Sequence, residues 1–552
     1  MIRWNGWGHQ HVTKELPESA ITLLNELCGP GNPRPDIPLE LITKDLPPSR
    51  IHVEHKAIVT DAKTRFQYSH GQSFQDWVTM RSGGKVLVSD GVALPETEES
   101  LKEVLALAKK HDWVVIPHGG GSSVVGHLTP LESKRSILTI SMSRLNRLCD
   151  LNETDHTATF QAGVLGPDLE AQLQNRGFTL GHFPQSFEFS SLGGWIVTRS
   201  SGQQSRYFGR MDENFIGGTV LMDDGILEIP NIPASSAGPD LRHLIAGSEG
   251  RMGILSEATI RIVKKPESDR VLAFFLPDFS KALNASRELA QQKTSMSMLR
   301  LSNSVETMTH LAMAGKERLI GLLKKYLSFR GQDPSKTCLC LIGITGDRKR
   351  VNVDKKLIKK MMHKHGAVYV GHAFEKTFKA NRFYSAYARN TLWDLGYGVD
   401  TLETALPWNK IHEAIDEVEG AIRSACTSKV HVFTHLSHVY ETGSSMYTSY
   451  IFPLEKSPEE TMRKWKAIKA AASEAIVQMG GTISHQHGVG TDHAPYLVEE
   501  KDHAGMNLIR AVLKEADPHS RFNPGKLLLQ NQSLQSGSSK SMKETTGQER
   551  IS

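Results

Sequence analysis

The spacing of apolar and polar residues changes several times along the chain, and each change marks a candidate domain boundary. Residues 1–80 mix short apolar segments with proline-rich stretches at 29–35 and 46–48, which predicts an N-terminal arm with short helices. Between 81 and 266, short apolar runs alternate with Gly and Asp turns, a pattern that is typical of strands. The predicted strands are 85–88, 113–116, 136–140, 156–162, 218–221 and 258–263, with an amphipathic helix at 96–109.

A second domain is expected at 267–455, where strand-like and helix-like apolar spacings alternate. The predicted strands are 271–275, 338–344 and 430–436, and the predicted helices are 279–292, 348–365 and 409–426. Residues 456–530 predict a helix at 457–479 and then a histidine-rich turn, and the Ser-rich residues 531–552 predict a disordered tail. The pattern as a whole indicates an α+β fold.

Composition narrows the function classes. The formal charge of +5 is the small difference between 65 basic and 60 acidic residues, and no basic block stands out, so a nucleic-acid partner is not expected. The five cysteines are scattered and fit a reducing compartment. No apolar run reaches about 18 residues, and no secretory or peroxisomal signal is recognised, so a cytoplasmic protein is expected.

One glycine-rich loop carries candidate chemistry. Ile116-Pro-His-Gly-Gly-Gly-Ser-Ser123 leaves a predicted strand, and its three glycines let backbone N–H groups converge on an anion. The loop matches neither the dinucleotide-binding nor the Walker pattern. By itself, the loop is as compatible with a plain flexible turn as it is with an anion-binding site.

Four further segments change that balance: Gln161-Ala-Gly-Val164, 184–195, 198–202 and 247–259. In this order and spacing they resemble the vanillyl-alcohol-oxidase family, in which the glycine loop cradles the FAD pyrophosphate. The resemblance implies a two-subdomain PCMH-type FAD-binding domain and an α+β cap domain with an antiparallel sheet. The residues that it places at the cofactor are Ile116, Pro117, His118, Gly119, Gly120, Gly121, Ser122, Ser123, Pro184, Ser186, Ser190, Gly193, Gly194, Thr198, Arg199, Ser200, Glu249, Gly250, Gly253 and Ile254.

A narrower resemblance comes from Arg3-Trp-Asn-Gly-Trp-Gly8, 404–408 and Ser484-His-Gln-His-Gly-Val-Gly490, which are similar to the alkyldihydroxyacetonephosphate synthase family. It implies an FAD-dependent transferase of ether-lipid synthesis. Such an enzyme exchanges the acyl group of acyl-dihydroxyacetone phosphate for a fatty alcohol, without net redox change. The resemblance assigns catalysis to Tyr447, His485 and His487, and binding of the substrate phosphate to Arg389.

Two departures from that family keep an alternative open. Gln486 replaces the middle one of three histidines, and Ala234 replaces an arginine. The alternative is an FAD-dependent dehydrogenase of a D-2-hydroxy acid or of glycerol phosphate. In either case His485 and His487, two residues apart, are expected to share one face of an extended segment and to line one pocket.

The remaining expectations concern metals, attachment of the cofactor and partners. His435 and His438, with His431 nearby, resemble metal ligands, but the spacing places them on different strand faces and favours a polar pocket wall, so no metal is expected. FAD is expected to be non-covalent, because His118, the candidate for attachment in the loop, precedes the glycines. A long-chain substrate implies peripheral membrane contact, and a homodimer stays open.

Overall fold

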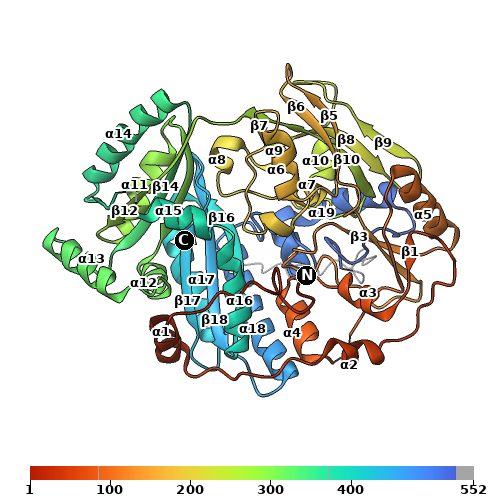
Figure 1. Ribbon diagram of the computed structural model, residues 1–552, viewed down its shortest axis with the longest axis horizontal. Helices are drawn as coiled ribbons and strands as arrows, with labels where there is room; N and C mark the ends of the chain where they lie inside the picture. Colours follow the sequence, from red (N-terminus) through yellow and green to blue (C-terminus); the bar gives the residue numbers. More distant parts are fainter. Residues whose placement is uncertain (85, 372, 530–552) are drawn as a thin grey trace, which may run out of the picture.

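The computed structural model describes residues 1–84, 86–371 and 373–529. Two sheet-containing domains lie side by side, with the first domain on the right of Figure 1 and the cap domain on the left. The described part of the first domain contains two larger sheets, which fits the two-subdomain expectation, and the short pair β7 (Phe178–Thr179) and β11 (Val263–Lys264). One larger sheet has the order β1 (Ile58–Val59), β2 (Gly91–Ala93), β4 (Ile137–Ser141) and β3 (Val114–His118), and the other has the order β5 (Leu148–Asn152), β6 (Thr157–Gln161), β10 (Ile254–Arg261), β8 (Phe215–Leu221) and β9 (Ile226–Ile229).

The glycine loop follows the edge strand β3, which pairs in parallel with β4. Helix α5 (Glu98–Lys110) covers this sheet because Leu101 and Val104, three residues apart on one face, are fully buried in the same apolar cluster as Val115. The chain returns to this point at its other end, where Phe522 bridges Val115. The start of the glycine loop is therefore fixed from both sides.

The cap domain is built on one seven-stranded antiparallel sheet. Its order is β15 (Val368–Tyr369), β12 (Ser268–Leu276), β14 (Cys338–Gly346), β13 (Met296–Ser302), β17 (His431–Leu436), β18 (Gly443–Pro453) and β16 (Tyr397–Pro407). Helices α11 (Phe279–Ala290), α14 (Arg348–Lys364), α17 (Ile411–Ala425) and α18 (Pro458–Gln478) contribute to the main apolar core beside this sheet. Helix α13 (Glu317–Phe329) belongs to a separate cluster with the alternate residues of β12 and β14.

The N-terminal arm is divided between the two domains: β1 joins a sheet of the first domain, whereas α1 (Glu18–Cys28) and α4 (Phe74–Ser82) pack on the cap. Helix α1 contacts α12 (Ser304–Met313), β17 and β18, and its buried residues cluster with those of α16 (Ala388–Asp394) and β18. Helix α4 contacts α18. Sequence order and spatial order therefore differ, because helix α1 packs against the cap although it begins 250 residues upstream of the cap sheet.

The α+β class and the antiparallel cap sheet are confirmed, and the predicted helices are all present within three residues of their expected ends. The strand expected at 85–88 is wrong: residues 86–88 lie in a connecting segment, and Lys85 lies outside the described residues, as does the tail expected at 531–552. Strands β16 and β18 and helix α19 (Leu497–Ala516) were not predicted. Both faces of β16 and β18 are largely covered, so their sequences lack clear alternation. Within the described ranges, no helix is long and apolar enough to span a membrane.

Candidate active site

A cavity of about 600 Å³ opens between the two domains. Its lining falls into three groups: a glycine wall from the first domain, a polar wall from the cap sheet, and an apolar end formed by the arm and the cap. This volume is in the range of small-molecule and cofactor sites. One cavity is therefore lined by residues that are more than 500 positions apart in the sequence.

The glycine wall is a close fit of backbone against backbone. A Cβ added to Gly120 would lie 1.8 Å from the carbonyl oxygen of Phe189, and Gly121 has a φ of +72°, in the left-handed region. The N–H groups of Gly120, Gly121 and Ser122 find no acceptor among the described residues. Since unpaired N–H groups around a concave loop attract anions, this loop fits the pyrophosphate of FAD.

Most residues expected at the cofactor do line this cavity. They are Pro117, Gly119, Gly120, Gly121, Ser122, Ser123, Pro184, Ser186, Ser190, Gly193, Gly194, Thr198, Ser200, Glu249, Gly250, Gly253 and Ile254. Three others lie outside the lining. Ile116 packs in an apolar cluster with Leu128, His118 lies against Tyr68, and Arg199 is bonded to His243. For these three, contact with the cofactor stays a prediction.

Glu249 connects the glycine wall to the histidine turn. Its backbone has a φ of +54°, and its carboxylate accepts hydrogen bonds from the N–H groups of Val489 and Gly490, the latter at 2.9 Å. The same carboxylate lies 3.0 Å from Nε2 of His127. This one side chain therefore fixes the position of the histidine turn relative to the glycine wall.

The polar wall is organised by strand register. Tyr447 on β18 lies directly opposite Glu403 on β16 and opposite His435 on β17. Directly paired residues of neighbouring strands point to the same face of a sheet. Three chemically active side chains therefore form one row across the sheet, with the tyrosine in the middle.

Tyr447 is a weak acid in this setting. Burial is the main cause that raises the pKa of its phenol to about 12. Its hydroxyl donates to Oγ1 of Thr401 at 3.2 Å, and its ring stacks on His435 with 4.9 Å between ring centroids. The ring of His487 approaches edge-on at 5.8 Å. The phenol is therefore protonated near neutral pH and lies next to an imidazole.

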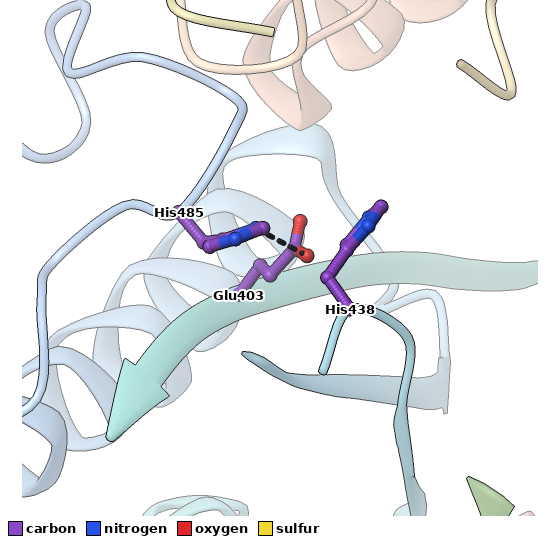
Figure 2. A group of neighbouring side chains, drawn as sticks. All are labelled: Glu403, His438 and His485. Atoms are coloured by element: carbon purple, nitrogen blue, oxygen red, sulfur yellow. Dashed lines mark hydrogen bonds and ion pairs between the residues drawn. The ribbon is translucent and has the colours of Figure 1, made fainter. Parts of the chain in front are cut away.

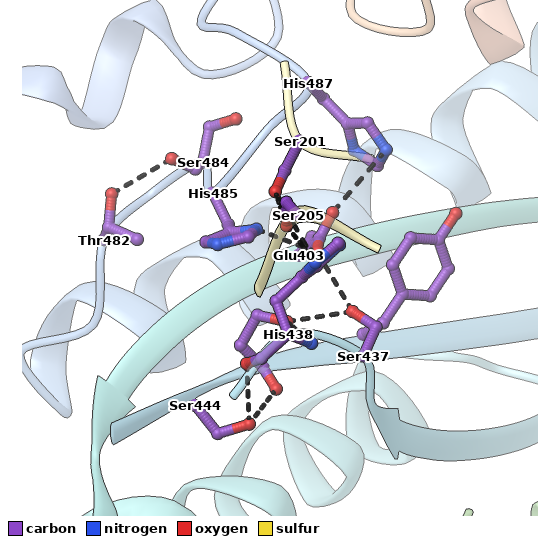
Figure 3. A network of polar contacts seen from close by, with 12 residues as sticks. Ser201, Ser205, Glu403, Ser437, His438, Ser444, Thr482, Ser484, His485 and His487 are labelled. Carbon is purple, nitrogen blue, oxygen red and sulfur yellow. Dashed lines mark hydrogen bonds and ion pairs between the residues drawn. The ribbon is translucent and has the colours of Figure 1, made fainter. Parts of the chain in front are cut away.

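The histidine turn corrects one expectation. His487 and Gln486 line the cavity, but His485 does not. Residues 484–490 form bends rather than a strand, so the two histidines do not share a face. Figure 3 shows His487 reaching Glu403 from one side and His485 from the other. The amide oxygen of Gln486 is buried and has no partner within the described part of the chain.

Both ring nitrogens of His485 are engaged in hydrogen bonds, and Figure 2 shows the one to Glu403. Nδ1 lies 3.1 Å from Glu403, and Nε2 lies 2.8 Å from Arg210 and 2.6 Å from the hydroxyl of Tyr440. Because the guanidinium can only donate, Nε2 accepts and Nδ1 carries the proton that goes to Glu403. His485 thus links an arginine to a carboxylate through hydrogen bonds.

Glu403 is the charged centre of this network. Burial alone would raise the pKa of its carboxyl, but His485 and then His487 overcome that effect and hold the pKa well below the usual range. His438 completes the group, and burial together with His485 lowers its pKa to about 3. The ligand atoms of Glu403, His438 and His485 lie within 4.8 Å of one another, close enough for a metal ion. The guanidinium hydrogen-bonded to His485 opposes a cation there.

Arg389 lies in the cavity wall on α16. Its Nη1 donates to the carbonyl of Gln72 at 2.6 Å, and its guanidinium lies over the ring of Trp77 at 4.3 Å. Burial lowers its pKa to about 10, so it remains a cation at neutral pH. Its Nη2 is buried and has no acceptor among the described residues. An anionic group of a ligand would satisfy that donor.

A second buried carboxylate, Glu306, lies on the side of Tyr447 away from Glu403. Glu306 is bonded to Nδ1 of His435 and to Arg300, both at 2.8 Å, and all three residues line the cavity. The cavity lining also includes His431, His435 and His438, in agreement with the polar pocket wall that the sequence favoured for them. His431 and His435 are four residues apart on β17 and share a face, contrary to the expectation for this group.

The far end of the cavity is apolar. Eight of its lining residues come from α1, α12, α16 and the cap sheet, and they gather in one apolar cluster: Ala20, Leu24, Met313, Ala388, Leu392, Val399, Phe433 and Ile451. Leu23 lines the same end. Such a surface suits a hydrocarbon chain, since burying each CH₂ group contributes about 0.8 kcal/mol.

Sequence reasoning missed Glu403, Arg210, Glu306 and Arg300. The signal for Glu403 was available, because it directly precedes the segment 404–408 that carries the family resemblance. For Arg210 and the pair of Glu306 with Arg300, no motif marks the residue. Their role depends on the strand register and on how the domains meet.

Comparison with known proteins agrees with the geometry. The model described as an FAD binding domain matches residues 89–229, and the one described as the C-terminal domain of FAD linked oxidases matches 265–527. The alkyldihydroxyacetonephosphate synthase of Dictyostelium discoideum is 30% identical over 572 aligned positions, which cover 96% of this chain and 93% of that protein. The chain belongs to the alkyldihydroxyacetonephosphate synthase family.

Solved structures place this synthase-family chain in the expected fold. A structure of alkyldihydroxyacetonephosphate synthase matches with a TM-score of 0.80 and 26% identity, over 95% of this chain and 98% of that one. A structure of p-cresol methylhydroxylase matches with a TM-score of 0.67 at 12% identity, over 93% and 97%, and supports the fold alone. The PCMH-type fold and the FAD cofactor are both confirmed.

Proposed function

We propose that this chain is an FAD-dependent synthase that exchanges the acyl group of acyl-dihydroxyacetone phosphate for a fatty alcohol, forming an ether bond. The observation that carries the proposal is the single cavity in which the glycine wall, the free donor of Arg389 and the apolar end meet. A phosphate headgroup with a long chain matches these features. A small hydroxy acid, the substrate of the alternative dehydrogenase, would leave the apolar end empty.

Arg389 binds the substrate phosphate in this proposal. Its position in the cavity wall is fixed by the carbonyl of Gln72 and the ring of Trp77, and its buried Nη2 has no acceptor among the described residues. A fixed guanidinium binds an anion with little loss of side-chain entropy. The apolar residues around Leu24 and Ile451 then hold the acyl or alkyl chain.

Proton transfer is assigned to Tyr447 and His487. Burial lowers the pKa of His487, so its imidazole is neutral at pH 7 and accepts a proton. The carboxylate of Glu403, 3.7 Å from Nε2 of His487, stabilises the imidazolium that results. In this proposal the hydroxyl of Tyr447 exchanges its proton with the substrate, and His487 assists as the neighbouring proton acceptor. His485 does not touch the cavity, so we assign it to positioning Glu403.

FAD, when bound, supplies the electron-accepting ring system that activates the substrate carbon for the exchange, and no net oxidation follows. We infer that it is held without a covalent bond. His118 packs against Tyr68 outside the cavity lining, and none of the five cysteines is among the lining residues that the structure describes. Acid precipitation should leave a colourless pellet, and a yellow pellet would contradict this inference.

The test of function uses purified holoprotein with palmitoyl-dihydroxyacetone phosphate and hexadecanol. Hexadecyl-dihydroxyacetone phosphate and palmitate should appear in equal amounts, because one bond is exchanged for another. Absence of the ether product would contradict the proposal. Oxidation of a D-2-hydroxy acid with bleaching of the flavin would favour the dehydrogenase.

A further inference from the structure

His127 is a buried histidine of the cavity wall to which the proposed function gives no role. Its side chain is 6% exposed, and it lines the cavity together with Ser123 and Glu249. Nδ1 of its ring lies 2.7 Å from the hydroxyl oxygen of Ser123, and its backbone N–H donates to the same oxygen at 3.4 Å. Two contacts with one hydroxyl therefore fix the imidazole relative to the glycine loop.

The other ring nitrogen, Nε2, has a neighbour but no aligned hydrogen bond. It lies 3.0 Å from a carboxylate oxygen of Glu249, yet it forms no hydrogen bond with any residue that the structure describes. That carboxylate already accepts from the N–H groups of Val489 and Gly490. Because a carboxylate can only accept, the ring proton that faces it belongs on Nε2. A buried donor without an acceptor is destabilising, so a ligand is expected to supply one.

The position of His127 connects the cofactor loop to the reacting groups. A Cβ added to Gly488 would lie 2.8 Å from Cε1 of His127, so the imidazole packs directly on the backbone of this glycine. Gly488 follows His487, the proposed base, whereas Ser123 belongs to the glycine wall that fits the pyrophosphate. The isoalloxazine ring of FAD must reach from that wall to Tyr447 and His487. His127 lies between the two.

We propose that His127 is a further cofactor-binding residue, whose Nε2–H donates a hydrogen bond to the isoalloxazine ring of bound FAD. The ring offers two carbonyl oxygens and two unprotonated nitrogens as acceptors. Reduction adds negative charge to these atoms, so a fixed donor stabilises the reduced ring more than the oxidised ring. His127 therefore makes the flavin a stronger electron acceptor. This inference rests on the FAD cofactor and is independent of the proposed reaction.

Three substitutions separate the donor from the rest of the imidazole. His127→Gln keeps an N–H donor at the reach of Nε2, whereas His127→Asn keeps a polar group only at the reach of Nδ1, next to Ser123. His127→Leu removes both. His70→Asn is the matched control, because His70 is 5% exposed, is bonded to the carbonyl of Phe66, and lies outside the described lining of the cavity.

The measurement is the midpoint potential of the flavin in purified holoprotein, against a reference dye and without substrate. At a fixed potential, the ratio of reduced to oxidised flavin should be roughly tenfold lower in His127→Asn and His127→Leu than in the wild type, because one hydrogen bond is lost. For a two-electron couple, this change corresponds to about 30 mV. His127→Gln and His70→Asn should stay within about threefold of the wild type. Unchanged potentials in His127→Asn and His127→Leu would overturn the proposal, as would a His127→Gln variant that falls as far as His127→Asn.

The flavin content of the purified variants is a second measurement that needs no potential. Loss of flavin from His127→Asn and His127→Leu, but not from His127→Gln, would support the donor. Loss from all three would assign the imidazole to packing on Gly488 and overturn the proposal. A yellow acid pellet from the wild type that turns colourless in His127→Asn would also overturn it, because it would identify a covalent bond to this histidine.

The outcome for the proposed function is separate. If the synthase proposal holds, ether synthesis by His127→Asn should fall roughly tenfold, because the flavin accepts electrons less readily. A wild-type enzyme that makes no ether product, with potentials that shift as expected among the variants, would contradict the proposed function alone.

Discussion

The two walls of the cavity work by different means. The first-domain wall presents backbone: glycines whose missing side chains allow close packing, and N–H groups with no internal acceptor. The cap wall presents side chains, with Tyr447 between two buried carboxylates, Glu403 and Glu306. Backbone donors have fixed positions and do not titrate, which suits a bound cofactor. The side chains of the cap can change protonation, which suits a reaction.

The two walls differ in how they fail. Damage to the glycine wall should remove the cofactor and with it all activity. Damage to the cap wall should leave the cofactor bound and alter the rate. Glu249 connects the glycine wall to the histidine turn, because it lines the cavity on the glycine side and accepts hydrogen bonds from the N–H groups of the turn.

The largest effect is expected for Gly120→Val. Its Cβ would overlap the carbonyl oxygen of Phe189, which belongs to the backbone and cannot rotate away, so the loop must change shape. Flavin absorbance of the purified variant should be lost. Gly420→Val is the control, because a Cβ at this helical glycine of α17 meets no atom within 4 Å. A Gly120→Val protein with full flavin content would refute the loop assignment.

Tyr447→Phe should keep the flavin and lose the rate. The aromatic ring that stacks on His435 remains, but the hydroxyl that exchanges a proton is gone. The expected loss in kcat is roughly 10²–10⁴-fold, the usual contribution of a general acid or base. Ether synthesis at the wild-type rate by a yellow Tyr447→Phe enzyme would rule out the proposed role of this tyrosine.

Glu403→Gln should change the pH dependence as well as the rate. The proposed base, His487, must be neutral, so activity falls as the pH drops through its pKa. Glu403 raises that pKa by stabilising the imidazolium, and its removal should therefore move the acid limb of the kcat profile to lower pH. We expect kcat to fall roughly tenfold, which is less than the loss expected from removing the base itself, because Glu403 acts only through His487.

Glu306→Gln is the matched variant for Glu403→Gln. It removes the carboxylate on the other side of Tyr447, which pairs with His435 rather than with the histidine turn. The acid limb of its profile should stay in place. Equal shifts in both variants would show that the two clusters are equivalent, which contradicts the assignment of the base to His487.

The smallest effect is expected for Gln486→His. The amide and an imidazole both offer a hydrogen-bond donor and an acceptor to the cavity, so kcat should change by about threefold or less. A large loss would show that the amide itself has a role that an imidazole cannot perform. In that case the departure from three histidines would mark a different reaction.

The glycine wall could be predicted from the sequence, because close backbone packing restricts the residue type to glycine, as Gly120 illustrates. The cap wall could be predicted only where a motif marks it, as for Tyr447 and His487. Glu403 directly precedes the marked segment 404–408, but its place beside Tyr447 follows from the register of β16 with β18. Glu306 became visible only through the contact of α12 with β17. The orientation of His485 was predicted wrongly because the turn is bent, and a bend depends on contacts such as those of Glu249.

The most direct test of the synthase proposal follows the flavin spectrum without oxygen while substrate turns over. Palmitoyl-dihydroxyacetone phosphate and hexadecanol are supplied together in excess over the enzyme, and product is quantified in the same sample. Many equivalents of ether product should accumulate while the flavin remains oxidised between turnovers, because the exchange involves no net redox change. A flavin that bleaches fully and stays reduced, with no ether product, would contradict the account and identify the protein as a dehydrogenase.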